Sequence, residues 1–182
     1  MRSAPNTFEV YHIRNQDRVI RVGDLIYVNF CSTTYMGYRI CVYRSFIAGR
    51  KPNRKEKDFY QKLYNRIYAV IEEIRPHATT ADAAKHSLPA STWSYEAEDR
   101  LLVSEVGHGI GMTYDEPSNS RIWSFDHPQV FEPGMVIAVE GREGEPGYGD
   151  FRFEEMLVTE NGHEIITTWR VQETMPVDSI VN

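Results

Sequence analysis

A stripe of apolar residues in the middle of the chain restricts the fold more than any other feature of the sequence. Its members recur every three or four residues, which gathers their side chains on one face of an α-helix: Phe59, Leu63, Ile67, Val70, Ile71 and Ile74. Asn53, with Glu56 three residues later, resembles a capping box at the start of this helix, and Pro76 ends it. The sequence therefore predicts one long helix whose apolar face packs into a core.

Two runs of residues ahead of this helix predict a β-hairpin. Residues 18–31 and 38–49 are rich in β-branched and aromatic side chains, which favour strands. Gly23-Asp24 predicts a turn within the first run, and Met36-Gly37 predicts the turn that connects the two runs. We expect the two runs to pair antiparallel.

The chain after the long helix predicts a shorter helix and a further set of strands. Thr79-Thr80 can cap a helix over Ala81–His86, which Pro89 ends. The strand-like segments are Leu101–Val106, Met135–Glu140, Arg152–Thr159 and Glu164–Arg170. Asn161-Gly162, between the last two, is a strong hairpin signal. The order β-β-α-α-β-β-β predicts an α+β domain with a curved antiparallel sheet covered by helices.

Length and charge exclude several classes of function. A chain of 182 residues is long enough for one well-cored domain, predicted over residues 18–182 with an irregular segment at residues 1–17. The formal net charge of −6 argues against nucleic acid or anionic membrane as partner. No apolar run approaches the roughly 20 residues that span a bilayer, and the first residues lack a secretory signal. Cys31 and Cys41 show no metal-finger or redox-motif spacing, so we expect a reduced, cytoplasmic setting.

Three residues in the second half of the chain have the chemistry of metal ligands. His108 lies between glycines in GHGIG, which keep bulk away from the imidazole and let the backbone approach a ligand. Glu140 ends the apolar run MVIAVE, and Glu154 lies within FRFEEMLV, where a buried carboxylate is costly unless paired or metal-bound. Each residue also has an explanation that involves no function. His108 can have a structural role, Glu140 can be exposed to solvent at a strand end, and Glu154 can form an ion pair with Arg152.

Taken together, these motifs resemble a known family. GHGIG, an acidic Glu-Pro turn, EPGMV, a strand-terminal Glu and RFEEMLVTENG follow one another as in the pita-bread family of methionine aminopeptidase, aminopeptidase P, prolidase and creatinase. The resemblance runs from about Arg18 to about Trp169. It implies a pseudo-twofold α+β fold with the site in the concavity of the sheet. Family members usually hold two divalent metals there with two Asp, one His and two Glu, around a hydroxide that attacks the scissile carbonyl.

The ligand set implied by the resemblance is incomplete in this chain. His108, Glu140 and Glu154 stand at the His and two Glu positions, whereas Asn29 and Cys41 replace the two Asp. An amide and a thiol remove two negative charges from a site that must neutralise two dications. We therefore expect no two-metal centre. Either no metal or one divalent metal is expected, held by His108, Glu140 and Glu154 with or without Cys41.

Within this family, creatinase works without metal and offers an informative comparison. It also has Asn at the position of Asn29, its catalytic His matches His12, and it shares the GEPG element found here at Gly144–Gly147. It lacks a Glu at the position of Glu154, and its substrate-binding Glu corresponds to Tyr43. The comparison implies a related reaction on a different substrate.

Three functions follow from this pattern. The first is a divergent, creatinase-like hydrolase or lyase that acts on a C–N or related bond of a small polar molecule or short peptide. In it, His12 acts as general acid/base and Glu140 anchors a cationic group, while Asp115 replaces the family's second active-site His as a substitute acid/base. The second is a catalytically inactive relative that serves as a binding or assembly module. The third, an Xaa-Pro metallopeptidase, needs the charges that Asn29 and Cys41 lack.

The sequence matches the family pattern only from the N-terminal hairpin onward. Family catalytic domains usually begin with helices well before the hairpin, whereas this chain starts almost at His12. We expect either that the chain is a piece of a longer protein or that a partner chain supplies the missing elements. The uncovered sheet face predicts exposed apolar area and a homo-oligomer, a dimer in the simplest case.

Overall fold

The computed structural model of the protein describes residues 2–3, 7, 18–30, 33–96, 105–112, 114–146, 148–158 and 161–167, with the backbone alone at residues 2–3, 105, 114–116, 118–119 and 149–158. The strands are β1 (Arg2–Ser3), β2 (Leu25–Asn29), β3 (Thr33–Tyr35), β4 (Tyr38–Ile40), β5 (Tyr43–Ile47), β6 (Glu105–Ile110), β7 (Tyr114–Ser120), β8 (Val136–Glu145), β9 (Gly149–Val158) and β10 (Glu164–Ile165). The helices are α1 (Arg54–Glu73), α2 (Thr80–Ala84), the short 3₁₀ helix η2 (Ala90–Trp93) and α3 (Arg121–Asp126). None of the helices in this part of the chain combines the length and hydropathy needed to cross a bilayer.

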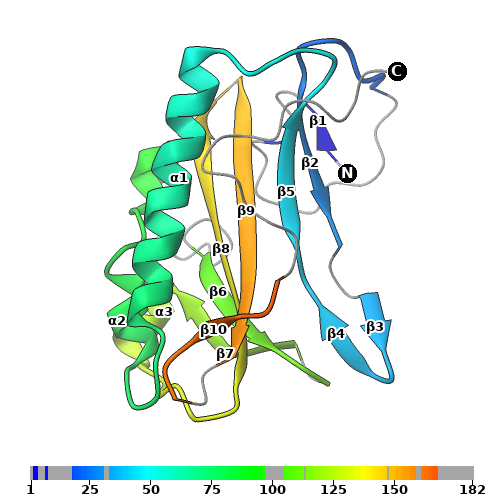
Figure 1. The fold of residues 1–182 in the computed structure, drawn as a ribbon. Coiled ribbons are helices and arrows are strands. Elements are labelled where there is room, and N and C mark those ends of the chain that lie inside the picture. The colour runs from blue at the N-terminus through cyan, green and yellow to red at the C-terminus, as the bar shows by residue number, and fades with distance from the viewer. Residues whose placement is uncertain are drawn as a thin grey trace.

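The strands form a five-stranded sheet, a three-stranded sheet and a two-stranded ladder (Figure 1). The five-stranded sheet has the order β10-β9-β8-β6-β7, and the smaller sheet has the order β1-β2-β5. The ladder joins β3 and β4 and extends away from the body of the molecule on the side opposite α1 (Figure 1). Helices and antiparallel strands thus occupy separate layers, as predicted for an α+β domain.

α1 lies along the five-stranded sheet and buries its apolar stripe against β8 (Figure 1). Leu63 and Ile67 belong to the same core cluster as Ile137 and Val139 of β8. Gly141, the next residue on that face of β8, has no room for a side chain: a Cβ there would lie 2.9 Å from Ile67 Cδ1 and 3.1 Å from Leu63 Cδ1. Burial of each such aliphatic side chain contributes about 1.5–3 kcal/mol. This contact therefore holds β8 firmly against the helix.

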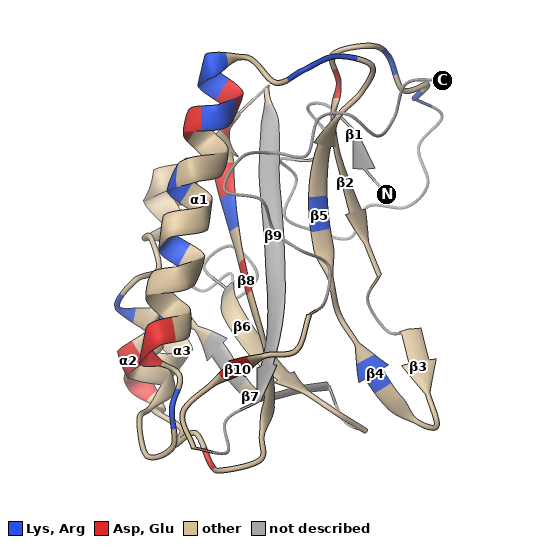
Figure 2. Ribbon diagram, viewed as in Figure 1, with Lys and Arg blue, Asp and Glu red and all other residues tan. Residues whose placement is uncertain are grey.

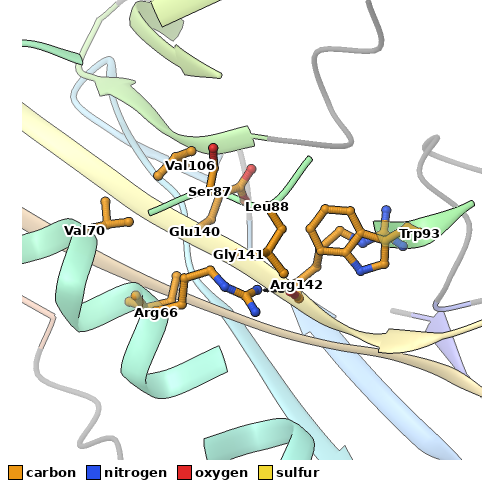
Figure 3. A pocket seen from close by; sticks show the side chains of 10 residues that line it. Arg66, Val70, Ser87, Leu88, Trp93, Val106, Glu140, Gly141 and Arg142 are labelled. Carbon is orange, nitrogen blue, oxygen red and sulfur yellow. Dashed lines mark hydrogen bonds between the residues drawn. The ribbon is translucent and has the colours of Figure 1, made fainter. Parts of the chain in front are cut away.

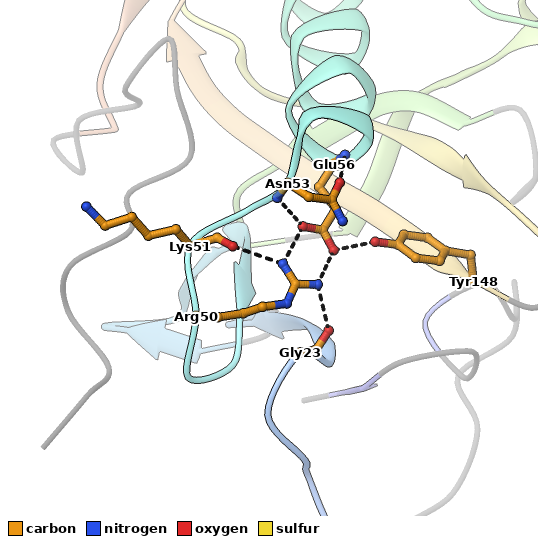
Figure 4. A network of polar contacts seen from close by, with 6 residues as sticks. All are labelled: Gly23, Arg50, Lys51, Asn53, Glu56 and Tyr148. Carbon is orange, nitrogen blue, oxygen red and sulfur yellow. Dashed lines mark hydrogen bonds and ion pairs between the residues drawn. The ribbon is translucent and has the colours of Figure 1, made fainter.

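A buried network around Glu56 fixes the start of α1 (Figure 4). Asn53 Oδ1 accepts a hydrogen bond from the Glu56 amide at 3.0 Å, and the Glu56 carboxylate accepts one from the Asn53 amide at 2.7 Å, so the predicted capping box is confirmed. The same carboxylate accepts two hydrogen bonds from Arg50, at 2.7 and 2.6 Å, and one from the hydroxyl of Tyr148. Arg50 also donates to the carbonyl of Gly23. The network thereby ties the turn before β2 and the turn between β8 and β9 to the helix.

The predicted N-terminal hairpin is confirmed from Leu25 onward and consists of two successive ladders, whereas residues 18–24 of the predicted first run form no strand. β2 pairs antiparallel with β5 in a register that sets Asn29 opposite Tyr43. Beyond this pair, β3 and β4 form the second ladder, which closes at the predicted turn. Met36 and Gly37 at that turn have φ of 51° and 88°. Two successive positive φ angles are typical of the two-residue turns whose twist matches that of the strands.

Two more local predictions are confirmed with small shifts of their ends. α2 begins at the predicted cap, where the side chains of Thr79 and Asp82 form a capping box, and it ends at Ala84 rather than at His86. The turn at Asn161-Gly162 leads β9 into β10, which pair antiparallel as predicted. The last strand is described only to Ile165, and residues 168–170 of its predicted range lie outside the described residues.

The strands around the centre of the large sheet differ most from the prediction. The strand expected at residues 101–106 is observed as β6, which runs on to Ile110, and residues 101–104 lie outside the described part of the chain. β7 and α3 were not predicted. The β7 sequence, YDEPSNS, is poor in strand-forming residues and contains Pro117, which lacks a backbone donor. β7 accommodates the proline because it is the outermost strand of the sheet as described.

The β2–β5 pair packs against β8 through aromatic side chains. Tyr27 and Tyr43 form a cluster with Ala138 of β8, which is completely buried. The two tyrosine rings lie 6.0 Å apart. At the other end of the pair, Leu25 and Ile47 join the core beneath α1. The face of the hairpin that carries the tyrosines therefore meets the face of β8 that carries Ala138.

Candidate functional site

The strand register brings the predicted ligand positions of the second half of the chain onto one face of the sheet. His108 on β6 lies opposite Ala138 on β8, and Glu140, two residues further along β8, lies opposite Glu154 on β9. Residues directly opposite each other, and residues two apart on one strand, share a face of the sheet. Directly paired Cβ atoms are about 4.5–5.5 Å apart, and diagonal neighbours about 7–8 Å. These positions are therefore close enough for joint contact with one small ligand.

A hydrogen bond to the backbone orients the ring of His108. Its side chain is 2% exposed, and Nδ1 lies 3.0 Å from the carbonyl oxygen of Gly109. A carbonyl oxygen can only accept, so Nδ1 is the donor, and Nε2 is the nitrogen that can offer a lone pair to a ligand. Metal-binding histidines commonly donate their other nitrogen in this way, which fixes the tautomer and the ring orientation.

The glycine before His108 has a packing role that the sequence analysis did not predict. Gly107 has φ of 154°, and a Cβ at this position would lie 2.2 Å from the carbonyl oxygen of Ala138. β6 can approach β8 this closely only without a side chain at Gly107. The expectation that the glycines leave room for a ligand is therefore corrected at Gly107, which makes room for the neighbouring strand and so sets the position of His108.

Glu140 lies in the middle of a strand rather than at its end. β8 continues five residues beyond it, to Glu145, so the expected strand end at Glu140 was wrong. The side chain is half-buried, and no hydrogen bond or ion pair joins it to another described residue. The carboxylate is therefore accessible to a ligand.

A pocket adjoins Glu140 and is lined by apolar and cationic side chains (Figure 3). Arg142 is 5% exposed, and its guanidinium lies over the ring of Trp93 at 5.2 Å from the centroid. Arg66, from α1, donates to the backbone carbonyl of Arg142 at 3.0 Å and pairs with Glu143. Sequence reasoning missed Trp93 and Arg142. The available signal was the alternation of EGREGE, which places Arg142 on the same face as Glu140 once β8 is known to continue.

Asn29, on the hairpin that packs against β8, contributes a buried polar atom. It is the last residue of β2 and lies on the same face of the hairpin as Tyr27 and Tyr43, which meet Ala138. Within the described residues, its Oδ1 is buried and accepts no hydrogen bond. A buried amide oxygen without a partner costs about 1–3 kcal/mol. The atom is therefore a natural acceptor for a ligand that enters between the hairpin and β8.

Cys41 differs from its expected chemistry. The residue is completely buried and is disulfide-bonded, so the thiol expected there is absent. The only other cysteine of the chain, Cys31, lies outside the described residues. A disulfide sulfur is neither a thiolate ligand nor a nucleophile. The prediction that Cys41 could assist in holding one metal is therefore corrected.

The donor positions on this face are compatible with one divalent metal. Among the described side chains, no three His, Cys, Asp or Glu gather in a way that could hold a metal. His108 and Glu140 are nevertheless on the same face, and the register adds the position of Glu154, whose side chain is not described. Two carboxylates balance the charge of one dication. Asn29 adds a neutral oxygen rather than a charge, so a second dication would remain uncompensated.

Two catalytic candidates from the sequence remain predictions. His12 lies outside the described residues. Asp115 follows Tyr114, which pairs with Ile110 of β6, so its backbone lies beside the strand of His108. The side chain of Asp115 is not described.

Comparison with known proteins identifies the family. Residues 2–161 match the profile of Metallopeptidase family M24. The chain belongs to this family. A peptidase of Bacillus subtilis, uncharacterized and called YqhT, is 29% identical over 152 residues, which are 83% of this chain and 41% of that protein. The Xaa-Pro dipeptidase of Pyrococcus horikoshii is 26% identical over 152 residues, with the same coverage of 83% and 41%.

A solved structure shows how far the likeness extends in space. The dipeptidase PepE of Mycobacterium ulcerans is 26% identical and superimposes with a TM-score of 0.74, over 95% of this chain and 45% of that one. The predicted α+β pita-bread fold is thereby confirmed. The chain spans about two fifths of the length of the curated relatives, 41% in each case.

Proposed function

We propose that this M24 chain provides a hydrolase site that cleaves a C–N bond of a small polar molecule or short peptide, with at most one divalent metal. The observation that carries the proposal is the donor set: His108 with Nε2 as acceptor, Glu140 without a described partner, and the buried, unpartnered Oδ1 of Asn29. The Xaa-Pro dipeptidase of Pyrococcus horikoshii supports a short peptide as the substrate class.

The residues have separate roles in this proposal. His108, Glu140 and Glu154 would hold one divalent metal, which would supply Lewis-acid polarisation of the substrate carbonyl. Asn29 Oδ1 accepts a hydrogen bond from an N–H group of the substrate. Water attacks the carbonyl carbon and forms the new C–O bond as the C–N bond breaks. His12, or Asp115 in its place, takes a proton from that water and transfers it to the leaving nitrogen, as a general acid/base does. When no metal is bound, Glu140 anchors a cationic group of the substrate, which is the creatinase-like form of the same proposal.

The test combines metal analysis with a substrate panel. The purified chain is equilibrated with Zn²⁺ or Mn²⁺, and bound metal is counted by mass spectrometry while Xaa-Pro dipeptides, other dipeptides and small amidines are assayed. We expect no more than one metal per chain. His108→Ala is expected to lower metal-dependent turnover more than about 100-fold, since even loss of an outer partner of a metal ligand costs 10–100-fold. His127→Ala is the control, because His127 is exposed just after α3.

The outcomes separate the alternatives. Two tightly held metals per chain would overturn the proposal and favour an Xaa-Pro metallopeptidase. Metal-free turnover that survives His108→Ala and disappears in His12→Ala would assign the creatinase-like form. The disulfide at Cys41 and the amide at Asn29 favour an inactive binding or assembly module as the second candidate, and absence of turnover on the whole panel would select it. The proposal places the chain in the cytoplasm as a homo-oligomer. The exposed apolar residues of the β3–β4 hairpin support the homo-oligomer.

A further inference from the structure

The β8–β9 pair carries a row of acidic positions and, one step further along the same face, a row of basic positions. The register sets Glu140 opposite Glu154 and Arg142 opposite Arg152. Residues two apart on a strand share a face, so the acidic row and the basic row both lie on the face of the candidate site. β8 accordingly shows both charge colours along its length (Figure 2). Two residues of a strand span about 7 Å, which is the separation of the two rows.

The basic row is a favourable place for an anion. Like charges directly opposite each other destabilise a sheet, and an anion beside them removes that repulsion. Arg142 is 5% exposed, so water does little to stabilise its charge. The ring of Trp93, whose centroid lies 5.2 Å from the guanidinium carbon, offsets part of this cost. A guanidinium has five N–H donors, so contact with a ring leaves it able to bind an anion as well.

Trp93 gives an independent reason to expect a ligand with an acceptor atom. Its side chain is buried, and within the described residues its Nε1 atom makes no hydrogen bond. An indole N–H can only donate, and burial without an acceptor costs stability. Trp93 and Arg142 both line the pocket that adjoins Glu140, where they lie side by side (Figure 3). One carboxylate could accept hydrogen bonds from both side chains.

The second guanidinium of the pocket has a different role. Arg66 pairs with Glu143 and donates to the backbone carbonyl of Arg142, so it neutralises a carboxylate of β8 and steadies the strand. The charges that remain to be matched by a ligand are therefore those of the acidic row and the basic row.

We infer that Arg142 and Trp93 form a carboxylate subsite, which selects substrates with a free carboxylate about 7 Å from the group held at the acidic row. The inference rests on the proposed function, because it takes the acidic row to hold the other end of the substrate, directly or through one metal. An extended peptide spans at most about 3.3–3.6 Å per residue, so a dipeptide has the required length. The nearby charge of Glu140 disfavours a doubly charged phosphate monoester, whereas a singly charged carboxylate matches the fork of a guanidinium.

The test uses a probe that cannot be hydrolysed. 5-Aminopentanoate has the chain length of glycylglycine but no peptide bond, and 5-aminopentanamide differs from it only in lacking the carboxylate charge. The affinity of the full chain for each is measured by calorimetric titration with equimolar Zn²⁺ present, so that the site can form with or without a metal. We expect the carboxylate to bind at least about tenfold more tightly than the amide, as one hydrogen bond to a charged group provides.

Two variants with matched controls assign this preference to the pocket. Arg142→Gln is expected to remove the preference for the carboxylate. Trp93→Phe keeps an aromatic ring but loses the N–H donor, and it is expected to lower the affinity for the carboxylate about fivefold. Arg75→Gln, at an exposed residue just after α1, and Trp123→Phe, at a residue that is 42% exposed, are expected to change neither affinity.

A spectroscopic measurement on the wild-type chain does not depend on the stability of any variant. The indole N–H signal of Trp93, identified by its absence in Trp93→Phe, is expected to shift when 5-aminopentanoate is added and to stay in place when the amide is added. Equal affinities of the wild-type chain for the two probes overturn the inference, and so does an unmoved Trp93 signal. Inorganic phosphate that binds more tightly than the carboxylate and moves the same signal overturns it too, in favour of a phosphorylated ligand.

The same titrations separate this inference from the proposed function. Turnover of the substrate panel without a preference for the carboxylate would retain the hydrolase and discard the subsite. A clear preference without turnover would retain the subsite and discard the hydrolase, because the probe binds without any bond being cleaved.

Discussion

At the scale of single residues, His108 depends on the absence of a side chain at Gly107. A Cβ at Gly107 would lie 2.2 Å from the Ala138 carbonyl oxygen, which cannot move without opening the β6–β8 ladder. We expect Gly107→Ala to lower the free energy of unfolding by about 3 kcal/mol, measured by urea denaturation. Gly111→Ala is the matched control, because nothing lies within 4 Å of a Cβ there. Equal losses in the two variants would contradict this account.

Asn29 allows a second prediction at the residue scale. Asn29→Asp places a negative charge at an oxygen that is buried and accepts no hydrogen bond within the described residues. We expect calorimetric titration to show at least about a tenfold gain in affinity for Mn²⁺, which corresponds to about 1.4 kcal/mol. Without metal, the variant is expected to be less stable, because a buried carboxylate without a partner is costly.

The control for this prediction is Asn65→Asp. It makes the same chemical change on the exposed side of α1 and is expected to alter neither metal affinity nor stability. An unchanged affinity for Mn²⁺ in Asn29→Asp would mean that this residue does not border the metal position.

At the scale of elements, the sequence predicts what is encoded locally. The capping box of Asn53 and Glu56 spans four residues, and the turn at Met36-Gly37 spans two, so both are visible without knowledge of the fold. β7 was missed because its place at the sheet edge, rather than its composition, makes Pro117 acceptable in a strand. The end of β8 was missed because the charged run after Glu140 resembles a loop.

The buried network at the start of α1 allows a prediction about pH. Burial disfavours the charged form of Glu56, but hydrogen bonds from Arg50, Tyr148 and Asn53 outweigh it and hold the pKa of Glu56 below its ordinary value of 4.5. A carboxyl whose pKa is lower in the folded state stabilises the fold above its unfolded pKa. The stabilisation by Glu56 is lost as the pH falls below about 4.5 and then through the lowered pKa of Glu56 in the folded state.

We therefore expect Glu56→Gln to lower the free energy of unfolding by about 3 kcal/mol at pH 7. This value is the lower end of the range for a buried ion pair that loses one partner. We take the lower end because the Arg50 side chain is 35% exposed. The difference from the wild type is expected to shrink between pH 5 and pH 3, measured by urea denaturation at each pH. Glu72→Gln, on the exposed face of α1, is the control and is expected to change stability by less than about 0.5 kcal/mol. A difference that stays constant with pH would assign the loss to packing alone.

At the scale of the whole molecule, the candidate site is assembled from two hairpins that are far apart in the chain. The motifs nominate His108, Glu140 and Asn29 as site residues without knowledge of the fold. Their common surface follows from the β6–β8 register and from the packing of the β2–β5 pair on Ala138, and neither is encoded in local spacing. The disulfide at Cys41 was also not predictable, because the spacing of the cysteines matches no known motif.

The disulfide makes the stability of the hairpin beside the site depend on whether the cysteines are oxidised or reduced. Cys41 directly follows β4, and Cys31, the other cysteine of the chain, precedes it by ten positions. A disulfide that closes a loop of this length contributes about 2–3 kcal/mol. We expect reduction to lower the free energy of unfolding by that amount, and we expect no such change in a chain that carries both Cys31→Ser and Cys41→Ser. Because disulfides are rare in the cytoplasm, rapid alkylation of cell lysates adds a second check. Two alkylated cysteines per chain would show that the cytoplasmic form keeps its thiols and would contradict the bond at Cys41.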